Sequence, residues 1–508
     1  MRNITLVFFC IWLSFFIFNC GKSNESKNDV IANYWPTEGW LTSTPEQQGM
    51  DSRQLVNAFN FIQKNKLHIH SMLVIRNGYA VVEAYFYPYT HSTVHNIASV
   101  TKSITSVLVG IALDKGYIKD VKKPFMDYFR DRSVANLDVN KENVTIENLL
   151  TMSTGFCRDS HEGEAQLGRM SASEDWVQFI LDLPMVTEPG QDFAYFSGGC
   201  QLISAIITQT TGMNELDFAR EHLFQPLGIH DVIWPTDPQG NNTGWGDLFM
   251  HPLDMAKIGY LLLNEGRWED KQVLSSEWVK QSTHQHAAIP NGQGYGYLWW
   301  VSGELSGLYE ARGRGGQSIA IWPEKDLIVV FTGGGFESRE VGSFIVNAIQ
   351  SDQPLQENIE VYRRLKNKIE AAAKQPIPKP VSPLPSTARK ISGKTFIFEP
   401  NAIGLRSFSL SFEDEAEALF KQDINGRVIE ARIGLDGVYR ISNSSRFGLP
   451  AALKGFWATE NEFVLVFYEA ANNFLYRTVV HFENDTASCR IVEKSGLVDL
   501  TLKAKIKQ

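Results

Sequence analysis

Ser99 and Lys102 stand three residues apart in the segment Ala98-Ser99-Val100-Thr101-Lys102-Ser103. Apolar residues recur at helical spacing over residues 104–112, which predicts a buried helix with Ser99 in its first turn. One turn of that helix brings the Lys102 amine back towards the Ser99 hydroxyl, and the amide groups at a helix start favour an anionic oxygen. The pattern also fits a capping serine followed by an exposed lysine.

This pair of residue types has a chemical meaning if the two side chains meet. A serine hydroxyl is a weak nucleophile at neutral pH until a neighbouring base takes its proton. Lysine is such a base only when neutral, which requires burial or a nearby positive charge to lower its pKa. Ser99 and Lys102 are therefore predicted to be a nucleophile and its base on one rigid element.

The elements that must position this pair form one unit over residues 47–352. A helical pattern covers residues 52–64, and strand-like runs joined by Asn77-Gly78 follow over residues 72–85. A second pair of strand-like runs, residues 318–331, lies at the other end, and the sequence between is mostly helical. This order predicts an α+β fold, an antiparallel sheet flanked by helices with a helical insert.

The remainder of the chain changes character. Residues 353–390 combine a helical pattern with a proline-rich linker, and residues 391–508 alternate apolar and polar positions in short runs. These runs predict a small all-β accessory domain, either a barrel or a sandwich. No catalytic constellation is found in it, so the sequence leaves open whether it covers the active site, binds a surface ligand or only packs.

The first residues are of another kind. Residues 1–20 carry an apolar run after Arg2 and are predicted to be an export signal, and Cys20 resembles the lipidated cysteine of bacterial lipoproteins. Residues 21–46 follow as a tether. The expected location is therefore periplasmic or at the cell surface, with attachment to a membrane through Cys20; a plain signal peptide or an uncleaved anchor remain alternatives.

The composition of the chain narrows the partners and cofactors that are expected. The chain has 508 residues, 43% of them hydrophobic, and a net charge of −9 without a basic block, which argues against nucleic acid as a partner. The histidines and cysteines lack metal-ligand spacing, so no metal or other cofactor is expected. Cys157 and Cys200 either form a disulfide or are two buried free thiols.

Six segments together resemble the β-lactamase-related serine hydrolases, and they resemble the esterases and 6-aminohexanoate-dimer hydrolases of that group more than class C β-lactamases. The resemblance covers roughly residues 47–352. It is specific because the six segments occur in the same order as in that family. The segments are residues 98–103, 144–156, 189–199, 254–259, 294–300 and 313–317.

The resemblance assigns roles to particular residues. It implies that Tyr195 relays protons between Ser99, Lys102 and the leaving group, and that the amides of Ser99 and Gly316 form an oxyanion hole. Ser197 stands where the family usually has asparagine, which puts β-lactam and peptidoglycan specificity in doubt. Gly313-Arg314-Gly315 stands in place of the family's third motif and lacks its lysine. The remaining candidate substrate-binding residues are Arg314, Gly315 and Gln317.

The sequence thus predicts a serine hydrolase that acts through an acyl-enzyme on an ester or on a linear or cyclic amide. A penicillin-binding protein, β-lactamase or D-amino-acid peptidase is the alternative enzyme class. A non-catalytic surface protein that binds cell-wall fragments is the alternative outside enzymes.

Overall fold

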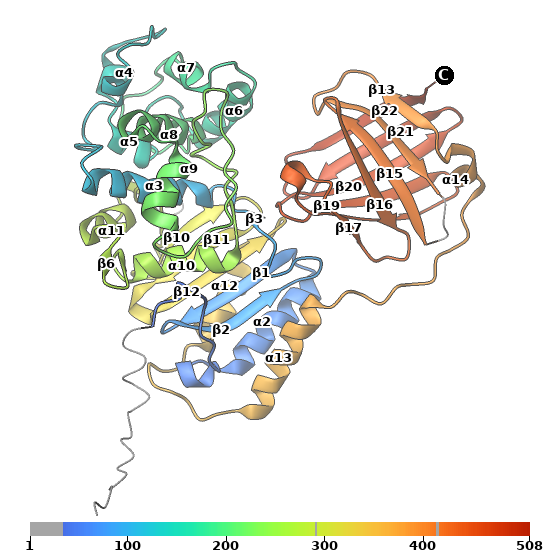
Figure 1. The fold of residues 1–508 in the computed structure, drawn as a ribbon, viewed down its shortest axis with the longest axis horizontal. Coiled ribbons are helices and arrows are strands. Elements are labelled where there is room, and N and C mark those ends of the chain that lie inside the picture. The colour runs from blue at the N-terminus through green and yellow to red at the C-terminus, as the bar shows by residue number, and fades with distance from the viewer. Residues whose placement is uncertain (1–33, 290–291, 413–415, 508) are drawn as a thin grey trace, which may run out of the picture. The chain divides into compact units, whose positions relative to one another are not determined.

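The structure, a computed structural model, describes residues 34–289, 292–412 and 416–507 (Figure 1). The predicted export signal and Cys20 lie outside the described residues. Among the helices of the described ranges, none is both long and apolar enough to cross a lipid bilayer. The last part of the predicted tether packs on the first domain, because Thr42 bridges Ala80 and the Trp40 indole nitrogen donates to the carbonyl of Leu253 (3.3 Å).

An antiparallel sheet joins the two ends of the first domain. Strand β1 lies between β2 and β12, and Leu73 of β1 pairs with Val330 of β12. The predicted hairpins are thus neighbours in one sheet, and the segment between them returns as an insert. In spatial order the strands are β2 (Tyr79–Tyr85), β1 (Ile69–Arg76), β12 (Leu327–Gly333), β11 (Gln317–Trp322), β10 (Tyr309–Gly313), β9 (Trp300–Val301), β8 (Gly294–Tyr295) and β7 (Ala287–Ala288).

Helices cover both faces of this sheet. On one face, α2 (Ser52–Asn65), α12 (Ser338–Ala348) and α13 (Ile359–Ala373) bury a shared apolar core, and α2 and α13 run side by side (Figure 1). On the other face lie α10 (Pro252–Leu263) and α3 (Val100–Asp114). Gly259 lets α10 approach closely, since a Cβ there would stand 2.8 Å from Ile328. Strand β1 is buried along its whole length because both of its faces are covered.

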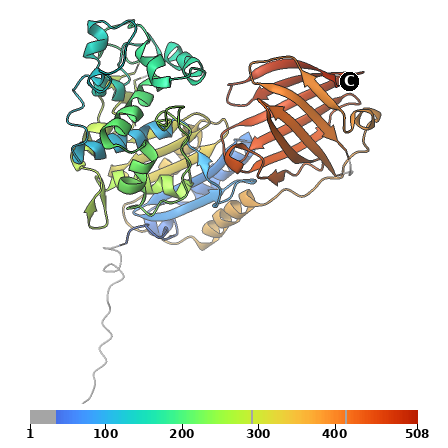
Figure 2. The same ribbon diagram turned by 45° about the horizontal axis from the view of Figure 1, so that its top comes forward.

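The helical insert stands on the α3 side of the sheet (Figure 2). Helix α8 packs against α3, α5, α6 and α7, so it lies at the centre of the insert. The remaining elements of the region are β3 (His95–Asn96), α4 (Val139–Asn143), α5 (Ile146–Leu150), α6 (Ser160–Ser171), α7 (Trp176–Leu181), α8 (Ser197–Thr211), α9 (Glu215–Ala219), β4 (Phe249–Met250), β5 (Arg267–Trp268), β6 (Lys271–Gln272) and α11 (Ser276–Thr283).

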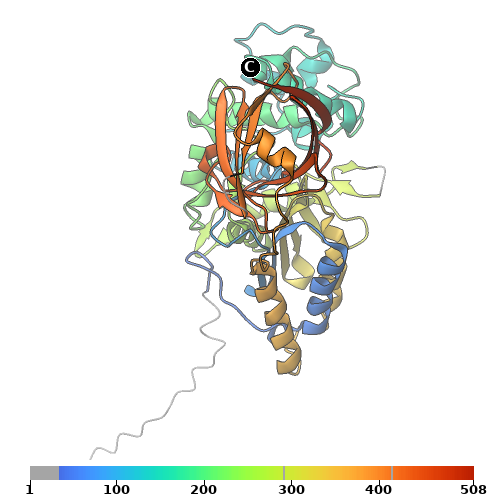
Figure 3. The ribbon, with the colours of Figure 1, turned by 90° about the vertical axis from the view of Figure 1, so that its right-hand side faces the viewer.

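The C-terminal domain is a closed barrel, which decides between the two architectures that the sequence left open. Its strands follow the order β16-β15-β14-β13-β22-β21-β20-β19-β18-β17, and a pairing of Gly434 in β16 with Lys454 in β18 closes the sheet. Figure 3 shows the strands curving round a common axis. The elements are α14 (Ser386–Ile391), β13 (Thr395–Phe398), β14 (Leu405–Ser411), β15 (Glu417–Ile424), β16 (Arg427–Gly434), β17 (Arg440–Ser442), β18 (Ala451–Trp457), β19 (Glu462–Glu469), β20 (Leu475–Glu483), β21 (Thr486–Glu493) and β22 (Asp499–Ile506).

A buried chain of hydrogen bonds joins the barrel to the first domain. The Tyr468 hydroxyl lies 2.7 Å from His70 Nε2, His70 Nδ1 lies 2.7 Å from His95 Nε2, and His95 Nδ1 lies 2.7 Å from the carbonyl of Asn96. Each group donates to the next when both imidazoles are neutral. Burial lowers the pKa of His70 well below its usual range and lowers that of His95 to about 4.

The chain of hydrogen bonds through His70 and His95 predicts that the protein loses stability in mild acid. The unfolded state binds protons at His70 and His95 below about pH 6.5, whereas in the folded state His95 stays neutral down to about pH 4, so stability falls as pH falls through this window. His95 alone contributes a loss of about 3 kcal/mol by pH 4. Unfolding by urea between pH 7 and pH 4.5 measures it.

Two histidine-to-glutamine variants test the assignment, one at a residue of the hydrogen-bond chain and one as its matched control. His95→Gln is expected to flatten the dependence of unfolding free energy on pH, while His161→Gln, at an exposed position of α6, leaves it unchanged. A wild-type stability that is constant between pH 7 and pH 5 would contradict the assignment.

Candidate active site

Ser99 occupies the last position before α3, in a turn with an unusual backbone. Ala98 has φ of 49°, a left-handed conformation that costs energy for a residue with a side chain. The Asn96 side chain accepts a hydrogen bond from the Ala98 amide (2.7 Å), and the Thr101 hydroxyl donates to the Ala98 carbonyl (2.6 Å). The Ser99 hydroxyl does not cap the helix, so the capping interpretation of this serine is wrong.

Lys102 is buried, with 1% of its surface exposed, and its amine is held by polar groups. Its Nζ donates to Ser99 Oγ at 3.0 Å and to the carbonyl oxygen of Trp245 at 2.7 Å. It also lies 4.8 Å from the centre of the Tyr195 ring. The helical spacing therefore does bring the lysine back onto the serine, and the lysine is not the exposed one of the alternative pattern.

Tyr195 completes a cluster of three side chains. Ser99 and Lys102 both act to lower the pKa of its hydroxyl, so the three groups lie close together. Tyr195 lies just before α8, where its amide donates to Ser160 Oγ (2.9 Å), and its ring stacks on Trp300 with centroids 6.0 Å apart. Segments far apart in the sequence are thus joined at one point beside the Ser99 hydroxyl.

The electrostatics of the cluster differ from the sequence prediction. Burial acts to lower the pKa of Lys102, but the Tyr195 oxygen and the Glu164 carboxylate outweigh it, so this pKa is raised and not lowered. Burial, together with Glu164, also raises the pKa of Tyr195, although Lys102 opposes the shift. At neutral pH the resting pair is therefore an ammonium and a phenol.

Two contributors to the cluster lie outside the predicted catalytic residues. Glu164 comes from α6, and its carboxylate accepts a hydrogen bond from the Ser197 amide (3.0 Å). Trp245 contributes only a backbone carbonyl, which no side-chain motif can indicate. Glu164 has no motif spacing to Ser99 or Tyr195 either, so only the packing of α6 on α8 reveals it.

Ser197 lies at the first position of α8, two residues after Tyr195. It is buried, and its hydroxyl has no hydrogen-bond partner within the structure. A buried hydroxyl without a partner is costly unless another molecule supplies one. Its place beside the cluster is compatible with the predicted contact to substrate.

The end of strand β10 approaches Ser99, but at a different glycine from the expected one. A Cβ on Gly313 would stand 3.0 Å from the Ser99 amide nitrogen and 2.6 Å from the carbonyl oxygen of Ile97. Gly316 instead packs against Phe336, whose ring a Cβ would meet at 2.3 Å. The backbone beside the Ser99 amide is therefore that of Gly313, and the predicted position of the second oxyanion donor shifts from Gly316 towards the strand end.

Arg314 does not extend freely towards a substrate, as predicted, but is held by the barrel. Its guanidinium donates to Asn473 Oδ1 (3.0 Å) and to the Ser495 hydroxyl, and lies over the Phe474 ring (4.6 Å). The buried carboxylate of Glu493 lies 3.9 Å from it. Since every one of these partners belongs to the barrel, the arginine joins the two domains.

Neighbouring residues of the β10–β11 turn are fixed in the same way. Asn473 Nδ2 donates back to the Arg314 carbonyl (3.1 Å), and its Cβ would lie 3.1 Å from a Cβ on Gly315, whose φ is 87°. The Gln317 side chain is saturated by backbone groups, since it donates to the carbonyls of Arg314 and Gly333 and accepts from the Gly333 amide. Gln317 therefore stabilises the turn and does not present its amide to a substrate.

The cysteines in the described ranges, including Cys157 and Cys200, are free thiols. Cys200 is buried in α8 close enough to Lys102 for each to shift the pKa of the other. Burial raises the pKa of this thiol to about 12, so it stays protonated. Of the two interpretations left open by the sequence, two buried thiols is the one observed.

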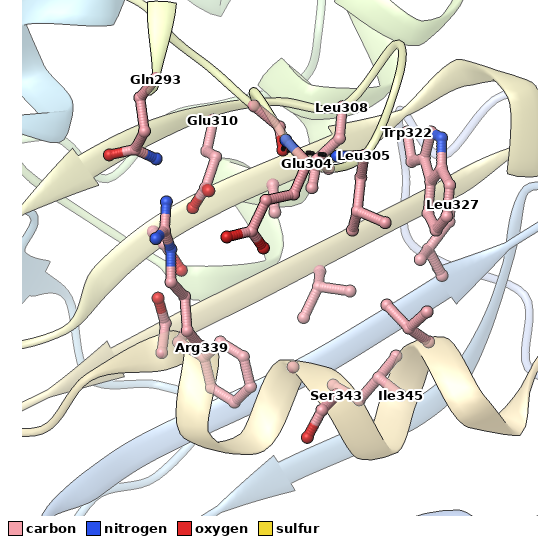
Figure 4. Close-up of a pocket in the computed structure, with 18 of the residues that line it drawn as sticks. Gln293, Glu304, Leu305, Leu308, Glu310, Trp322, Leu327, Arg339, Ser343 and Ile345 are labelled. Carbon is pink, nitrogen blue, oxygen red and sulfur yellow. Dashed lines mark hydrogen bonds between the residues drawn. The ribbon is translucent and has the colours of Figure 1, made fainter. Parts of the chain in front are cut away.

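A hollow of about 350 Å³ lies elsewhere, between the sheet and α12 (Figure 4). Glu310 and Arg339 lie among its polar lining, and Leu305, Trp322 and Leu327 among its apolar lining. Successive residues of a strand point to opposite faces, so Glu310 faces this hollow while Ala311 and Gly313 face α3. The sheet separates the hollow from Ser99, and the hollow is not part of the cluster.

Comparison with known proteins identifies the family of this chain. The model of the Beta-lactamase family matches residues 46–341, more than half of the chain. The chain belongs to the β-lactamase family. A 6-aminohexanoate-dimer hydrolase of Paenarthrobacter ureafaciens is 22% identical over 283 residues, which span 51% of this chain and 71% of that protein.

Other members of the β-lactamase family extend the comparison. A solved structure from Bacillus anthracis, provisionally described as a 6-aminohexanoate-dimer hydrolase, has the same fold with a TM-score of 0.51 and 21% identity, and covers 66% of this chain and 90% of its own. The β-lactamase of Escherichia coli K12 is 25% identical over 170 residues, 33% of this chain and 42% of that enzyme. The fold predicted from the sequence, a β-lactamase-like α+β domain followed by an all-β domain, is therefore confirmed.

The contacts of Arg314 generate a test of what the barrel does for the β10–β11 turn. Asn473→Ala removes two hydrogen bonds to Arg314 and is expected to destabilise the turn by about 1–2 kcal/mol. Amide hydrogen exchange of residues 313–317 should become about 5- to 30-fold faster. Asn443→Ala, at an exposed position of the same domain, is the matched control and should leave exchange unchanged. Equal exchange in both variants would mean that the turn holds its shape without the barrel.

Proposed function

We propose that this protein is a serine hydrolase that forms an acyl-enzyme on Ser99. The observation that carries the proposal is the contact of Ser99 Oγ with Lys102 Nζ at 3.0 Å, with the centre of the Tyr195 ring 4.8 Å from the same Nζ. A nucleophile within hydrogen-bond reach of groups that exchange protons, at a helix start, is the arrangement that acyl transfer needs.

In the proposed reaction Ser99 Oγ attacks the carbonyl carbon of the substrate. Its proton passes to the Lys102–Tyr195 pair, in the form of the pair that has lost one proton, and is returned to the leaving alkoxide or amine. Water then attacks the acyl-enzyme, gives its proton to the same pair, and releases the acid as the proton returns to Ser99. The two groups titrate together, so the pair and not either residue is the base.

The oxyanion of each tetrahedral intermediate requires backbone donors. We assign one to the Ser99 amide at the start of α3 and the other to the end of strand β10 beside Gly313, in place of the Gly316 amide. Each such donor contributes about 3–4 kcal/mol of transition-state stabilisation in enzymes of this type.

The substrate class we propose is an ester or a linear or cyclic amide. The name of the Paenarthrobacter relative, a 6-aminohexanoate-dimer hydrolase, supports including linear amides. Export and attachment to a membrane through Cys20 remain part of the proposal, on the sequence of residues 1–20.

The test uses p-nitrophenyl butyrate and a fluorophosphonate probe. Wild type is expected to hydrolyse the ester and to gain the probe mass on the peptide that carries Ser99, whereas Ser99→Ala should lose at least about 10³-fold in kcat/KM and all labelling. The matched control is Ser106→Ala, which removes a buried, unpartnered hydroxyl from the same helix and should change neither.

The same assays separate the alternatives. An unlabelled and inactive wild type would favour a non-catalytic surface protein. Faster turnover of nitrocefin, or of a peptide ending in D-Ala-D-Ala, than of the ester would place the protein with the β-lactamases and peptidases. Full activity of Ser99→Ala would contradict the mechanism.

The raised pKa values of Lys102 and Tyr195 predict the pH dependence of the reaction. The reactive form of the pair has one proton fewer than the resting form, so log kcat/KM should rise with pH and still be rising at pH 9. Glu164→Gln removes a negative charge that favours the ammonium and disfavours the phenolate. This variant is expected to shift the rising limb to lower pH and to increase kcat/KM at pH 7 by about three- to tenfold.

Glutamine at position 164 can still accept the hydrogen bond from Ser197, so the substitution changes charge more than geometry. Glu162→Gln, on the same helix, is the control and should leave the limb in place, because no part of the shifts at Lys102 and Tyr195 comes from it. A pH profile of Glu164→Gln that coincides with wild type would show that this carboxylate does not act on the pair.

A further inference from the structure

The barrel encloses a cavity of about 270 Å³. Alternate residues of β14, β15, β19, β20 and β21 point inward, as the pleat of each strand requires. Six of the apolar lining residues are Phe408, Leu410, Phe420, Phe463, Leu465 and Ile491. Protein interiors are close-packed, with few voids larger than a water molecule, and an engineered apolar cavity of about 150 Å³ already binds benzene. A space of this size inside the barrel is therefore suited to a small apolar molecule.

One polar group in the cavity has no partner. Gln422 of β15 is 8% exposed and lines the cavity, and its Nε2 makes no hydrogen bond within the structure. Its cross-strand neighbour is Phe408, and most of the other residues that line the cavity are apolar as well. An unsatisfied buried amide is costly, and a bound molecule with a hydrogen-bond acceptor would remove that cost.

A second polar residue limits the charge of such a molecule. Glu469, at the end of β19, lines the same cavity, and its Oε2 accepts a hydrogen bond from Asn472 Nδ2 (2.9 Å). Burial raises the pKa of this carboxyl, although Asn472 and two arginines act to lower it. When ionised, Glu469 repels a carboxylate, and no lysine or arginine is among the described residues that line the cavity, so nothing there offsets the cost of burying a charged ligand. The acceptor on the ligand is therefore an uncharged oxygen.

From these three features we infer that the barrel is a binding site for a neutral, largely aliphatic molecule that carries a hydroxyl or carbonyl oxygen, which accepts a hydrogen bond from Gln422 Nε2. The site is separate from Ser99, since none of the residues of the Ser99 cluster lines it. It gives the accessory domain a ligand of its own in addition to its contacts with the β10–β11 turn.

Binding of N-phenyl-1-naphthylamine, a neutral fluorophore without a strong acceptor, tests the cavity itself. We expect saturable binding at one site per chain, unchanged in Ser99→Ala and after fluorophosphonate treatment. 1-Decanol should displace the fluorophore at a concentration at least tenfold lower than decanoate does. Unsaturable binding, loss of binding on blocking Ser99, or equal displacement by decanoate would overturn the inference.

Two variants test the assigned residues. Gln422→Leu should raise the concentration of 1-decanol needed for displacement by about fivefold, the value of one neutral hydrogen bond, while the fluorophore binds within twofold of wild type. Lys421→Leu, the neighbouring residue that faces solvent, is the matched control and should change neither. Identical displacement by 1-decanol in Gln422→Leu and wild type would overturn the role of Gln422.

Leu465→Trp fills the cavity and should weaken fluorophore binding at least tenfold while the thermal unfolding midpoint stays the same or rises. Undiminished binding to the folded variant would show that the fluorophore binds elsewhere and would overturn the inference. Should this variant fail to fold, the comparison of Gln422→Leu with Lys421→Leu decides the question.

Discussion

The buried ammonium of Lys102 sets the requirement that the surrounding structure meets. Removing a charge from water is expensive unless polar groups surround it, and here Ser99 Oγ and the Trp245 carbonyl accept its hydrogen bonds while the centre of the Tyr195 ring lies 4.8 Å away. Glu164 adds a negative charge from α6. These groups come from four separate parts of the chain, so satisfying one lysine fixes the relative positions of α3, α6, the segment before α8 and the loop before β4.

The barrel takes part in building the cluster although it contributes no reactive group. The carbonyl of Ala471 accepts a hydrogen bond from the Asn96 amide (2.8 Å), and Asn96 in turn holds the strained turn at Ala98. On the other side, Asn473 holds Arg314 and the turn that follows Gly313. Both backbone segments that flank the Ser99 hydroxyl are therefore braced by one loop, that between β19 and β20, which explains why an accessory domain can matter to the chemistry of its neighbour.

Small residues and strain are concentrated where the two domains and Ser99 meet. Ala98 adopts a left-handed conformation, and Gly313 leaves room for the Ser99 amide that no side chain could share. Such features lower local stability and persist only when neighbours hold them. In this molecule the neighbours are a buried histidine chain and an asparagine-arginine pair, both of which span the two domains.

The sequence by itself determined the class of fold and the identity of the reactive residues that could meet. Helical spacing brought Lys102 onto Ser99, and the paired hairpins determined the sheet, because these features depend on periodicities of three to four and of two residues along the chain. Tertiary structure alone decided the partners of Arg314, the glycine beside Ser99, the closure of the barrel and the influence of Glu164. Each of these depends on contacts between residues distant in the chain, as with Arg314 and Asn473, and such contacts leave no periodic signal. Tertiary structure also decides the charge state of Lys102, because the pKa of this residue results from burial and from neighbours that only packing brings together.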